Sequence, residues 1–301
     1  MSGRRIVPAV VGLVLLVCAP FLPAAGQPTL GGRLSPSSAV GPGSGSTAQP
    51  SQLAAGRPLF MQFNMCGNKC SGGPREKAAA LVDSIVERGP GAVSLNEACR
   101  NQLTTVTRML RKRHYPMNVR FKTTLKAASG ACGGHDFGNA VLTRARIVEV
   151  NQKTFRAQTG ADEKRAILCA KARMARTTWI CSTHTVHDNT TIRARQIKQA
   201  TNIVDGFRGP VVLMGDFNDV PLADSLDRLY APKYGYGASG NFLEVDASYQ
   251  GDQCRCGEST SGSRKIDYIF IKKSAFIQRE GDATYASYSD HDPLYGRPQW
   301  R

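Results

Sequence analysis

Short, nearly continuous apolar runs recur along the chain from about residue 57 onward, and they predict buried strands. Runs of about four to eight residues that end at turn-forming or polar residues are typical of strands covered on both faces. The runs assigned to strands are Leu59–Phe63, Ala92–Leu95, Asn139–Thr143, Ile147–Asn151, Ile167–Ala170, Thr177–Thr183, Val211–Met214 and Ile266–Ile271.

Three other segments repeat apolar residues at helical spacing. Arg75–Glu87 follows Pro74, which favours a helix start, and Asn101–Arg113 and Ile192–Phe207 show the same period. In the first helix the expected buried side carries Ala79, Val82, Ile85 and Val86. Helices and strands interleave, but several successive strands have no helix between them. The pattern therefore predicts an α/β (α+β) fold in which sheets with antiparallel pairs are covered by helices.

The first 26 residues predict a secretory signal peptide. Arg4 and Arg5 form a charged start, Ile6–Leu22 is almost wholly apolar, and small residues at 24–26 offer a cleavage site. An uncleaved anchor is disfavoured by three prolines in and beside this short run, so we expect no stable membrane insertion after removal of the signal. A lipoprotein signal at Cys18 is a minor alternative, because the preceding Val17 is bulky.

Residues 27–56 predict a flexible linker. The segment consists largely of Gly, Pro, Ser, Ala and Thr, and Arg33 is its one charge, so it offers too little apolar surface to fold. The expected organisation is a signal peptide at 1–26, a linker at 27–56 and a catalytic domain at 57–301.

Eight cysteines remain after removal of the signal, and an even number in an exported protein indicates disulfides. The two strands that flank Ala175 form a predicted hairpin that puts Cys169 opposite Cys181. Cys66 with Cys70 is plausible across a short loop, and Cys99 with Cys132 would follow if Cys254 bonds Cys256. A zinc site is the rival, but the cysteines lack the two closely spaced pairs typical of one.

Polar side chains stand at or beside the ends of the apolar runs. Buried carboxylates, amides and imidazoles are costly without partners, so strand ends that gather such groups need a metal ion, a substrate or each other. Their mixture of oxygen ligands and histidines is typical of metal-assisted attack on phosphorus. Each of these polar positions, taken alone, also fits an ordinary turn or a surface salt bridge. The positions are Asn64, Glu97, His184, Asp216 with Asn218, Asp267, and Asp290 with His291.

Taken in order, the motifs around these residues resemble the endonuclease/exonuclease/phosphatase superfamily, which includes deoxyribonuclease I-like enzymes, and a secreted bacterial-type member in particular. The resemblance covers Leu59–Leu294 and depends on the ordered set, since each piece is weak. The motifs are Gln62-Phe63-Asn64, Leu95-Asn96-Glu97, Gly138-Asn139-Ala140-Val141-Leu142, Ser182-Thr183-His184, Gly215-Asp216-Phe217-Asn218, Ile266-Asp267-Tyr268 and Ser289-Asp290-His291.

The resemblance implies a four-layer sandwich of two packed mixed sheets flanked by helices. It implies Mg²⁺, with Mn²⁺ or Ca²⁺ as alternatives, held by Glu97 with Asn64 and Asp290 close by. The implied roles of the other residues follow the family. His291 is the base that activates water with Asp267 as its partner, Asp216 and Asn218 position nucleophile and phosphate, His184 stabilises phosphoryl oxygens or aids the leaving group, and Asn139 helps position the substrate. Which histidine Asp267 orients stays open.

The formal net charge is +16, which favours a polyanionic partner, although a merely solvated cationic surface gives the same value. We expect a secreted, monomeric nuclease. Its expected substrate is DNA, and RNA is a second candidate substrate. Basic helices at 101–113 and 192–207 would bind the backbone if they lie beside the site. A sphingomyelinase-like phospholipid phosphodiesterase and a non-catalytic binding or toxin subunit are the alternatives. An inositol phosphatase is disfavoured, because Lys265-Ile266-Asp267-Tyr268 stands where those enzymes carry Trp-Cys-Asp-Arg.

Overall fold

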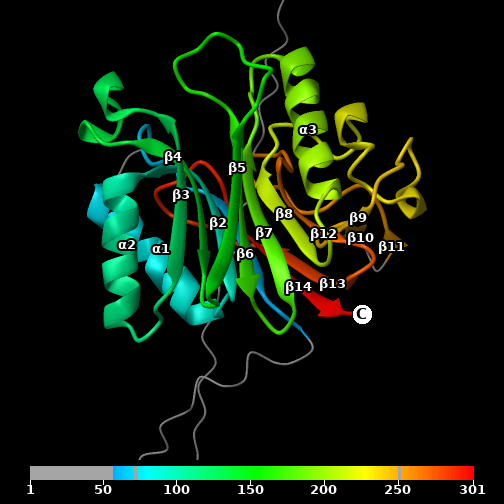
Figure 1. Ribbon diagram of the computed structural model, residues 1–301, viewed down its shortest axis with the longest axis horizontal. Coiled ribbons are helices and arrows are strands. Elements are labelled where there is room, and N and C mark those ends of the chain that lie inside the picture. The colour runs from blue at the N-terminus through cyan, green and yellow to red at the C-terminus, as the bar shows by residue number, and fades with distance from the viewer. Residues whose placement is uncertain (1–56, 71–72, 250–251) are drawn as a thin grey trace, which may run out of the picture. The chain divides into compact units, whose positions relative to one another are not determined.

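The structure is a computed structural model that describes residues 57–301 apart from 71–72 and 250–251. The predicted signal peptide (1–26) and linker (27–56) lie outside the described residues. Two six-stranded sheets face each other, and helices cover their outer faces (Figure 1). This arrangement confirms the predicted four-layer sandwich.

The first sheet has the strand order β13-β14-β1-β2-β4-β3. Strands β1 and β2 run parallel and the other neighbours run antiparallel, so the sheet is mixed. The sequence pattern predicted β1, β2 and β4 and missed the other three. The bounds are β1 Phe60–Asn64, β2 Ala92–Cys99, β3 Asn118–Leu125, β4 Phe137–Thr143, β13 Phe276–Ala283 and β14 Leu294–Trp300.

The second sheet has the order β5-β6-β7-β8-β12-β9, with β7 and β8 parallel. All of its strands except β9 were predicted. A separate two-stranded ribbon joins β10 to β11. The bounds are β5 Ile147–Thr154, β6 Ala166–Arg173, β7 Thr177–His184, β8 Val211–Asp216, β9 Phe242–Glu244, β10 Ser248–Tyr249, β11 Asp252–Gln253 and β12 Asp267–Lys272.

Helices α1 and α2 cover the first sheet and α3 lies on the opposite side of the sandwich (Figure 1). In α1, Val82 and Ile85 are buried as predicted, whereas Ala79 is half-buried and its neighbour Ala78 faces the sheet. The Asn189 side chain accepts a hydrogen bond from the backbone N–H of Ile192 and so caps α3. The helices are α1 Pro74–Arg88, α2 Arg100–Lys112 and α3 Thr190–Asp205, with short 3₁₀ turns η1 Ala127–Ser129, η2 Ala131–Gly133, η3 Asp224–Leu226 and η4 Pro232–Tyr234.

Alternation along β1 separates the apolar packing from the polar chemistry. Met61 and Phe63 point outward into the cluster that packs on α1 and α2, whereas Gln62 and Asn64 point inward between the two sheets. Inward polar side chains at this end of the sheets are buried, so each needs a partner from the facing sheet. That requirement places the polar groups of both sheets together.

Four disulfides lie within the described residues, and they match the expected pairing. Cys169 faces Cys181 across the β6–β7 hairpin, with 4.0 Å between their Cα atoms. The other bonds join Cys66 to Cys70, Cys99 to Cys132, and Cys254 to Cys256. Within the same described residues, no helix is long and apolar enough to cross a membrane.

Candidate active site

Strand register brings the predicted site residues to one edge of the sandwich. In the second sheet His184 lies beside Asp216 on parallel strands, and Asp216 lies opposite Asp267 on the antiparallel β12. In the first sheet Asn64 lies beside Asn96, one residue before Glu97. Because the two sheets face each other, their polar ends form one cleft.

Two of these residues occupy left-handed backbone conformations that side chains rarely adopt. Glu97 has φ 53° within a register shift of β2, and Asn218 has φ 51° just after β8. Such a bulge redirects a side chain that would otherwise follow the strand alternation. Glu97 thereby lines the cleft instead of entering the core.

His291 and Asp267 form a buried pair. His291 Nδ1 lies 2.7 Å from Asp267 Oδ2, and because a carboxylate only accepts, Nδ1 is the donor. Gln62 Nε2 donates to the other oxygen of Asp267 at 3.1 Å. Burial opposes a charged ring, but Asp267 and then Asp216 outweigh it and raise the pKa of His291 to about 10. The structure therefore shows that Asp267 orients His291, the point left open by the sequence.

Asp216 lies between the two histidines. Its Oδ2 is 3.4 Å from His184 Nε2 and 3.7 Å from His291 Nε2, and it accepts a hydrogen bond from Asn64 Nδ2 at 3.1 Å. Burial and then the charge of Asp267 raise the pKa of Asp216 to about 7. The backbone N–H of Asn218 donates to its Oδ1 at 2.8 Å, so the turn after β8 holds the carboxylate.

His184 is held from its far side by an arginine that the sequence reasoning did not select. Arg165 Nη1 lies 2.7 Å from His184 Nδ1 and 3.1 Å from Glu163 Oε1. On the cleft side, Asn218 Nδ2 lies 3.2 Å from His184 Nε2. Burial and then the charge of Arg165 lower the pKa of His184 well below its ordinary 6.5. At neutral pH the ring is therefore uncharged.

A buried amide network supports the site from behind. Asn96 Oδ1 accepts from Gln62 Nε2 at 2.7 Å and from the backbone N–H of Asp216 at 2.9 Å. Asn96 Nδ2 donates to Asn139 Oδ1 at 3.1 Å and lies 3.3 Å from Ser182 Oγ. Asn139, predicted to position substrate, thus lies in this network and not among the residues that line the cleft.

The cleft has a volume of about 370 Å³, and the carboxylates of Glu97, Asp216 and Asp290 line it. Asn64 Nδ2 donates to Glu97 at 3.2 Å, while its oxygen accepts from the Cys66 N–H and keeps one lone pair. Several carboxylates around one small cleft repel one another, and hard oxygen ligands suit a divalent ion such as Mg²⁺. The donor set therefore fits the implied metal.

Two clusters of potential metal ligands occur in the described part of the chain. Asp216, Asp267 and His291 form one, with ligand atoms within 4.8 Å of one another. The other contains Asp290 with Cys66 and Cys70, but those cysteines form a disulfide and have no thiolate to offer. The second cluster therefore offers an ion only Asp290, and in the first cluster Asp267 and His291 already bond each other.

Cationic side chains line the cleft, but they come from loops and not from the basic helices. Lys69 and Arg264 are exposed at its lining. Helix α2 begins directly after β2 reaches the site and runs away from it, so its basic C-terminal turn lies far from the cleft. In α3, Arg193 is buried in an ion pair with Asp219 at 3.1 Å.

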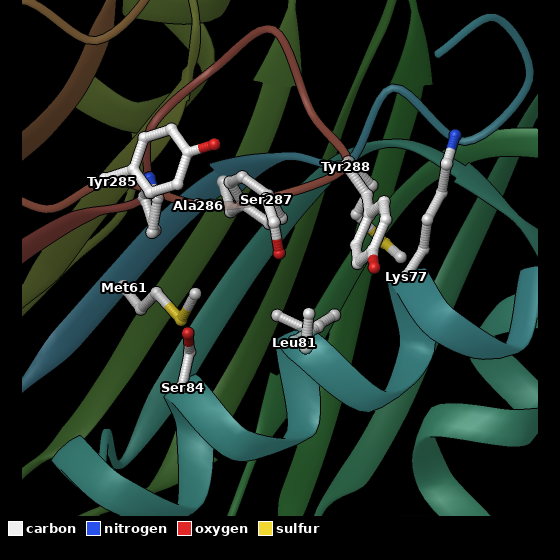
Figure 2. A pocket seen from close by; sticks show the side chains of 12 residues that line it. Met61, Lys77, Leu81, Ser84, Tyr285, Ala286, Ser287 and Tyr288 are labelled. Carbon is white, nitrogen blue, oxygen red and sulfur yellow. The ribbon is translucent and has the colours of Figure 1, made fainter. Parts of the chain in front are cut away.

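A second, apolar cavity of about 200 Å³ lies on the other face of β1. Figure 2 shows Met61 of β1 and Leu81 of α1, which line the cavity, and the loop at Tyr285–Tyr288 above them. Tyr285 and Tyr288 are 87% and 43% exposed. This loop continues directly into Asp290 and His291, so the apolar cavity adjoins the loop that carries these two cleft residues.

The chain belongs to the Endonuclease/Exonuclease/phosphatase family, whose model matches residues 61–291. Members of this family are phosphoesterase hydrolases that generally depend on a divalent metal ion. Comparison with curated proteins gives no match.

Solved structures share the fold at low sequence identity. The human Nocturnin catalytic domain with bound sulfate is 17% identical, with a TM-score of 0.63 over 81% of this chain and 95% of that one. An endonuclease/exonuclease/phosphatase family protein from Bacteroides thetaiotaomicron is 14% identical, with a TM-score of 0.62 over 81% and 98%. A mannosyl-6-phosphatase from the same organism is 15% identical, with a TM-score of 0.59 over 80% and 99%.

Proposed function

We propose that this protein is an exported, divalent-metal-dependent phosphodiesterase that hydrolyses DNA, with RNA as a second substrate. One observation carries the proposal: the cleft joins the His291–Asp267 pair and three carboxylates to the cationic side chains Lys69 and Arg264. The histidine pair and the carboxylates suit attack of water on a phosphorus atom. The two cations suit a substrate that carries further phosphates next to the one that is cleaved.

In this mechanism His291 is the general base. Its Nδ1 donates to Asp267, so Nε2 faces the cleft and takes the proton of the attacking water. Asp267 then stabilises the imidazolium that forms. Asp267 and Asp216 raise the pKa of His291 to about 10, so the ring is charged at neutral pH in the metal-free protein. A divalent ion bound in the cleft would offset these carboxylates, lower that pKa and favour the neutral ring that the base role requires.

The remaining residues position the reactants. Asp216 and Asn218 hold the water and a phosphoryl oxygen, and the neutral His184 ring offers a hydrogen-bond donor. Glu97 and Asp290 would hold the divalent ion, with Asn64 beside them. When bound, the ion would supply Lewis-acid stabilisation of the negative charge that develops on the phosphoryl oxygens.

The preference for nucleic acid depends on the cations. Within the described residues, the Lys69 ammonium and the Arg264 guanidinium make no hydrogen bond or ion pair, so both are free for phosphate. Contacts of this kind bind the backbone without reading bases. The net charge of +16 adds attraction for a polyanion over the whole surface.

A second candidate is a sphingomyelinase-like phospholipid phosphodiesterase. The exposed rings of Tyr285 and Tyr288 above an apolar cavity favour it, because aromatic side chains of this kind insert at the surface of a bilayer (Figure 2). We rank it second because the cavity lies on the opposite face of β1 from the carboxylates, whereas the cations line the cleft itself.

Export is part of the proposal. Four disulfides within the described residues are typical of an oxidising compartment, and the apolar run at residues 6–22 supports a cleaved signal peptide. We propose that the exported protein acts as a monomer.

The test is to incubate the purified protein with plasmid DNA, RNA and sphingomyelin, each with Mg²⁺, Mn²⁺, Ca²⁺ or a chelator. Nicking or cleavage of DNA that requires the metal, and that Glu97→Ala loses, is the expected result. Cleavage of sphingomyelin without cleavage of nucleic acid would reverse the ranking. Binding of DNA without hydrolysis under all metal conditions would favour a non-catalytic subunit.

A further inference from the structure

Arg165 is fixed beside the active site by an unusual number of contacts. It directly precedes β6, whose first residue lies opposite His184 in the sheet register. Its backbone N–H donates to Gln158 Oε1 at 2.9 Å, and its backbone oxygen accepts from Gln158 Nε2 at 2.9 Å. The side chain is buried and ion-paired with Glu163. Such a guanidinium is preorganised and loses little conformational freedom on binding a ligand.

The contact between Arg165 and His184 determines where the imidazole proton lies. A guanidinium has donors and no acceptor, so at 2.7 Å from Arg165 Nη1 the Nδ1 atom of His184 must accept. The proton of the neutral ring therefore lies on Nε2, which has the Asp216 carboxylate as an acceptor at 3.4 Å. Asn218 Nδ2 is also a donor and lies 3.2 Å from Nε2, but it donates to the backbone oxygen of Thr185 at 3.0 Å, and the shorter contact with Arg165 sets the tautomer. A second proton on Nδ1 would place two donors, and two positive charges, against each other.

Arg165 also has donors to spare. Its Nη1 donates a hydrogen bond to His184 and forms an ion pair with Glu163. Its Nε and Nη2 make no hydrogen bond to another described residue. Neither atom is buried without a partner, and Arg165 itself lines the cleft. Arg165 can therefore offer further N–H donors on the side of the cleft that His184 also lines.

We propose that Arg165 and His184 form a single clamp for the non-bridging oxygens of the scissile phosphate, in which Arg165 keeps the His184 proton on Nε2. The inference rests on the proposed phosphodiesterase function. The Nε2 proton stays on the ring throughout the reaction, so the departing oxygen takes its proton from solvent water and not from His184. Glu163 positions Arg165 and does not touch the substrate.

The experiment compares Arg165→Met, Arg165→Lys and the matched control Lys164→Met, an exposed neighbour whose ammonium donates to the backbone oxygen of Ala161. Rates are measured in the wild type and each variant with phosphodiesters that carry p-nitrophenolate or an alkoxide as the leaving group. Arg165→Met should lower kcat by about 10²- to 10³-fold with both esters and change KM little. Lys164→Met should match wild type.

A second readout does not depend on activity. Nitrogen-15 NMR of labelled histidine in the wild type should show His184 protonated on Nε2, and in Arg165→Met a mixture of both tautomers. Arg165→Lys keeps a donor to Nδ1, so it should keep the tautomer while losing much of the rate. Because this variant keeps the buried charge beside Glu163, it also serves if Arg165→Met does not fold.

Two results would overturn the clamp. A rate loss confined to the alkoxide ester would make His184 the acid for the leaving group, and a wild-type His184 protonated on Nδ1 would remove the role of Arg165. If wild type cleaves neither ester, the proposed function fails, but the tautomer still tests the contact between Arg165 and His184.

Discussion

Asp267→Asn should test whether His291 needs the charge and the accepting oxygen of Asp267, because asparagine has nearly the same size and shape. The carboxylate accepts from His291 Nδ1 through one oxygen and from Gln62 Nε2 through the other. An asparagine has one oxygen, so its NH₂ must face one of these two donors. If it faces His291, the ring proton moves to Nε2 and the basic lone pair leaves the cleft.

The expected effect on the rate is large. The same exchange in a serine protease triad lowers kcat by about 10⁴-fold because the histidine takes the wrong tautomer, and we expect a loss of about 10³- to 10⁴-fold here. The matched control is Asp83→Asn, which removes a carboxylate that is exposed and pairs with Arg113. That variant should keep the wild-type rate.

The same change should alter stability in a pH-dependent way. A pKa of about 10 for His291, against an ordinary 6.5, corresponds to roughly 5 kcal/mol in favour of the charged ring. Losing one partner of a buried pair costs about 3–5 kcal/mol. Because the folded-state pKa is raised, this stabilisation is complete below pH 6.5 and is lost as the pH rises through about 10.

Urea unfolding of wild type and Asp267→Asn at pH 6 and at pH 10.5 measures this difference. At pH 6 the variant should be less stable by about 3–5 kcal/mol, and at pH 10.5 by about 1 kcal/mol, the contribution of a neutral hydrogen bond. Equal differences at both pH values, or a wild-type rate in the variant, would refute the assigned pairing.

Three further predictions concern other parts of the molecule. Glu97→Gln should raise the Mg²⁺ concentration for half-maximal rate by more than about 100-fold while thermal melting stays near wild type, since the residue lines the cleft and does not pack in the core; an unchanged metal requirement would remove Glu97 from the ion. Replacing Lys69 and Arg264 by Met should reduce the slope of log affinity for DNA against log salt by about 1 to 2, as measured by fluorescence anisotropy. An unchanged slope would mean that neither cation contacts phosphate. Replacing Cys169 and Cys181 by Ala should lower the free energy of unfolding by about 3 kcal/mol, because the bond closes a short buried hairpin; a urea midpoint equal to that of wild type would contradict this.

The sequence pattern predicted the buried central strands and missed strands at the edges. Strand β3 carries alternating charges on a half-exposed sheet edge, so it lacks a continuous apolar run. Strand β14 contains Pro298, which argues against a strand from sequence alone. In the structure Pro298 lies opposite the register shift of β13, where a missing N–H is tolerated. Such a site is visible only when both strands are placed.

The sequence by itself predicted the family, and with it the phosphoesterase class, and it predicted which polar residues meet, because carboxylates, amides and histidines at strand ends are costly unless a fold uses them together. It also determined the disulfide between Cys169 and Cys181 through the hairpin register. It did not determine which histidine pairs with Asp267, since both lie far from it along the chain. It also did not reveal Arg165, which resembles any other arginine until β6 places it beside His184. Only tertiary structure decides such pairings, because the partner and tautomer of an imidazole depend on distances between residues that are remote in sequence.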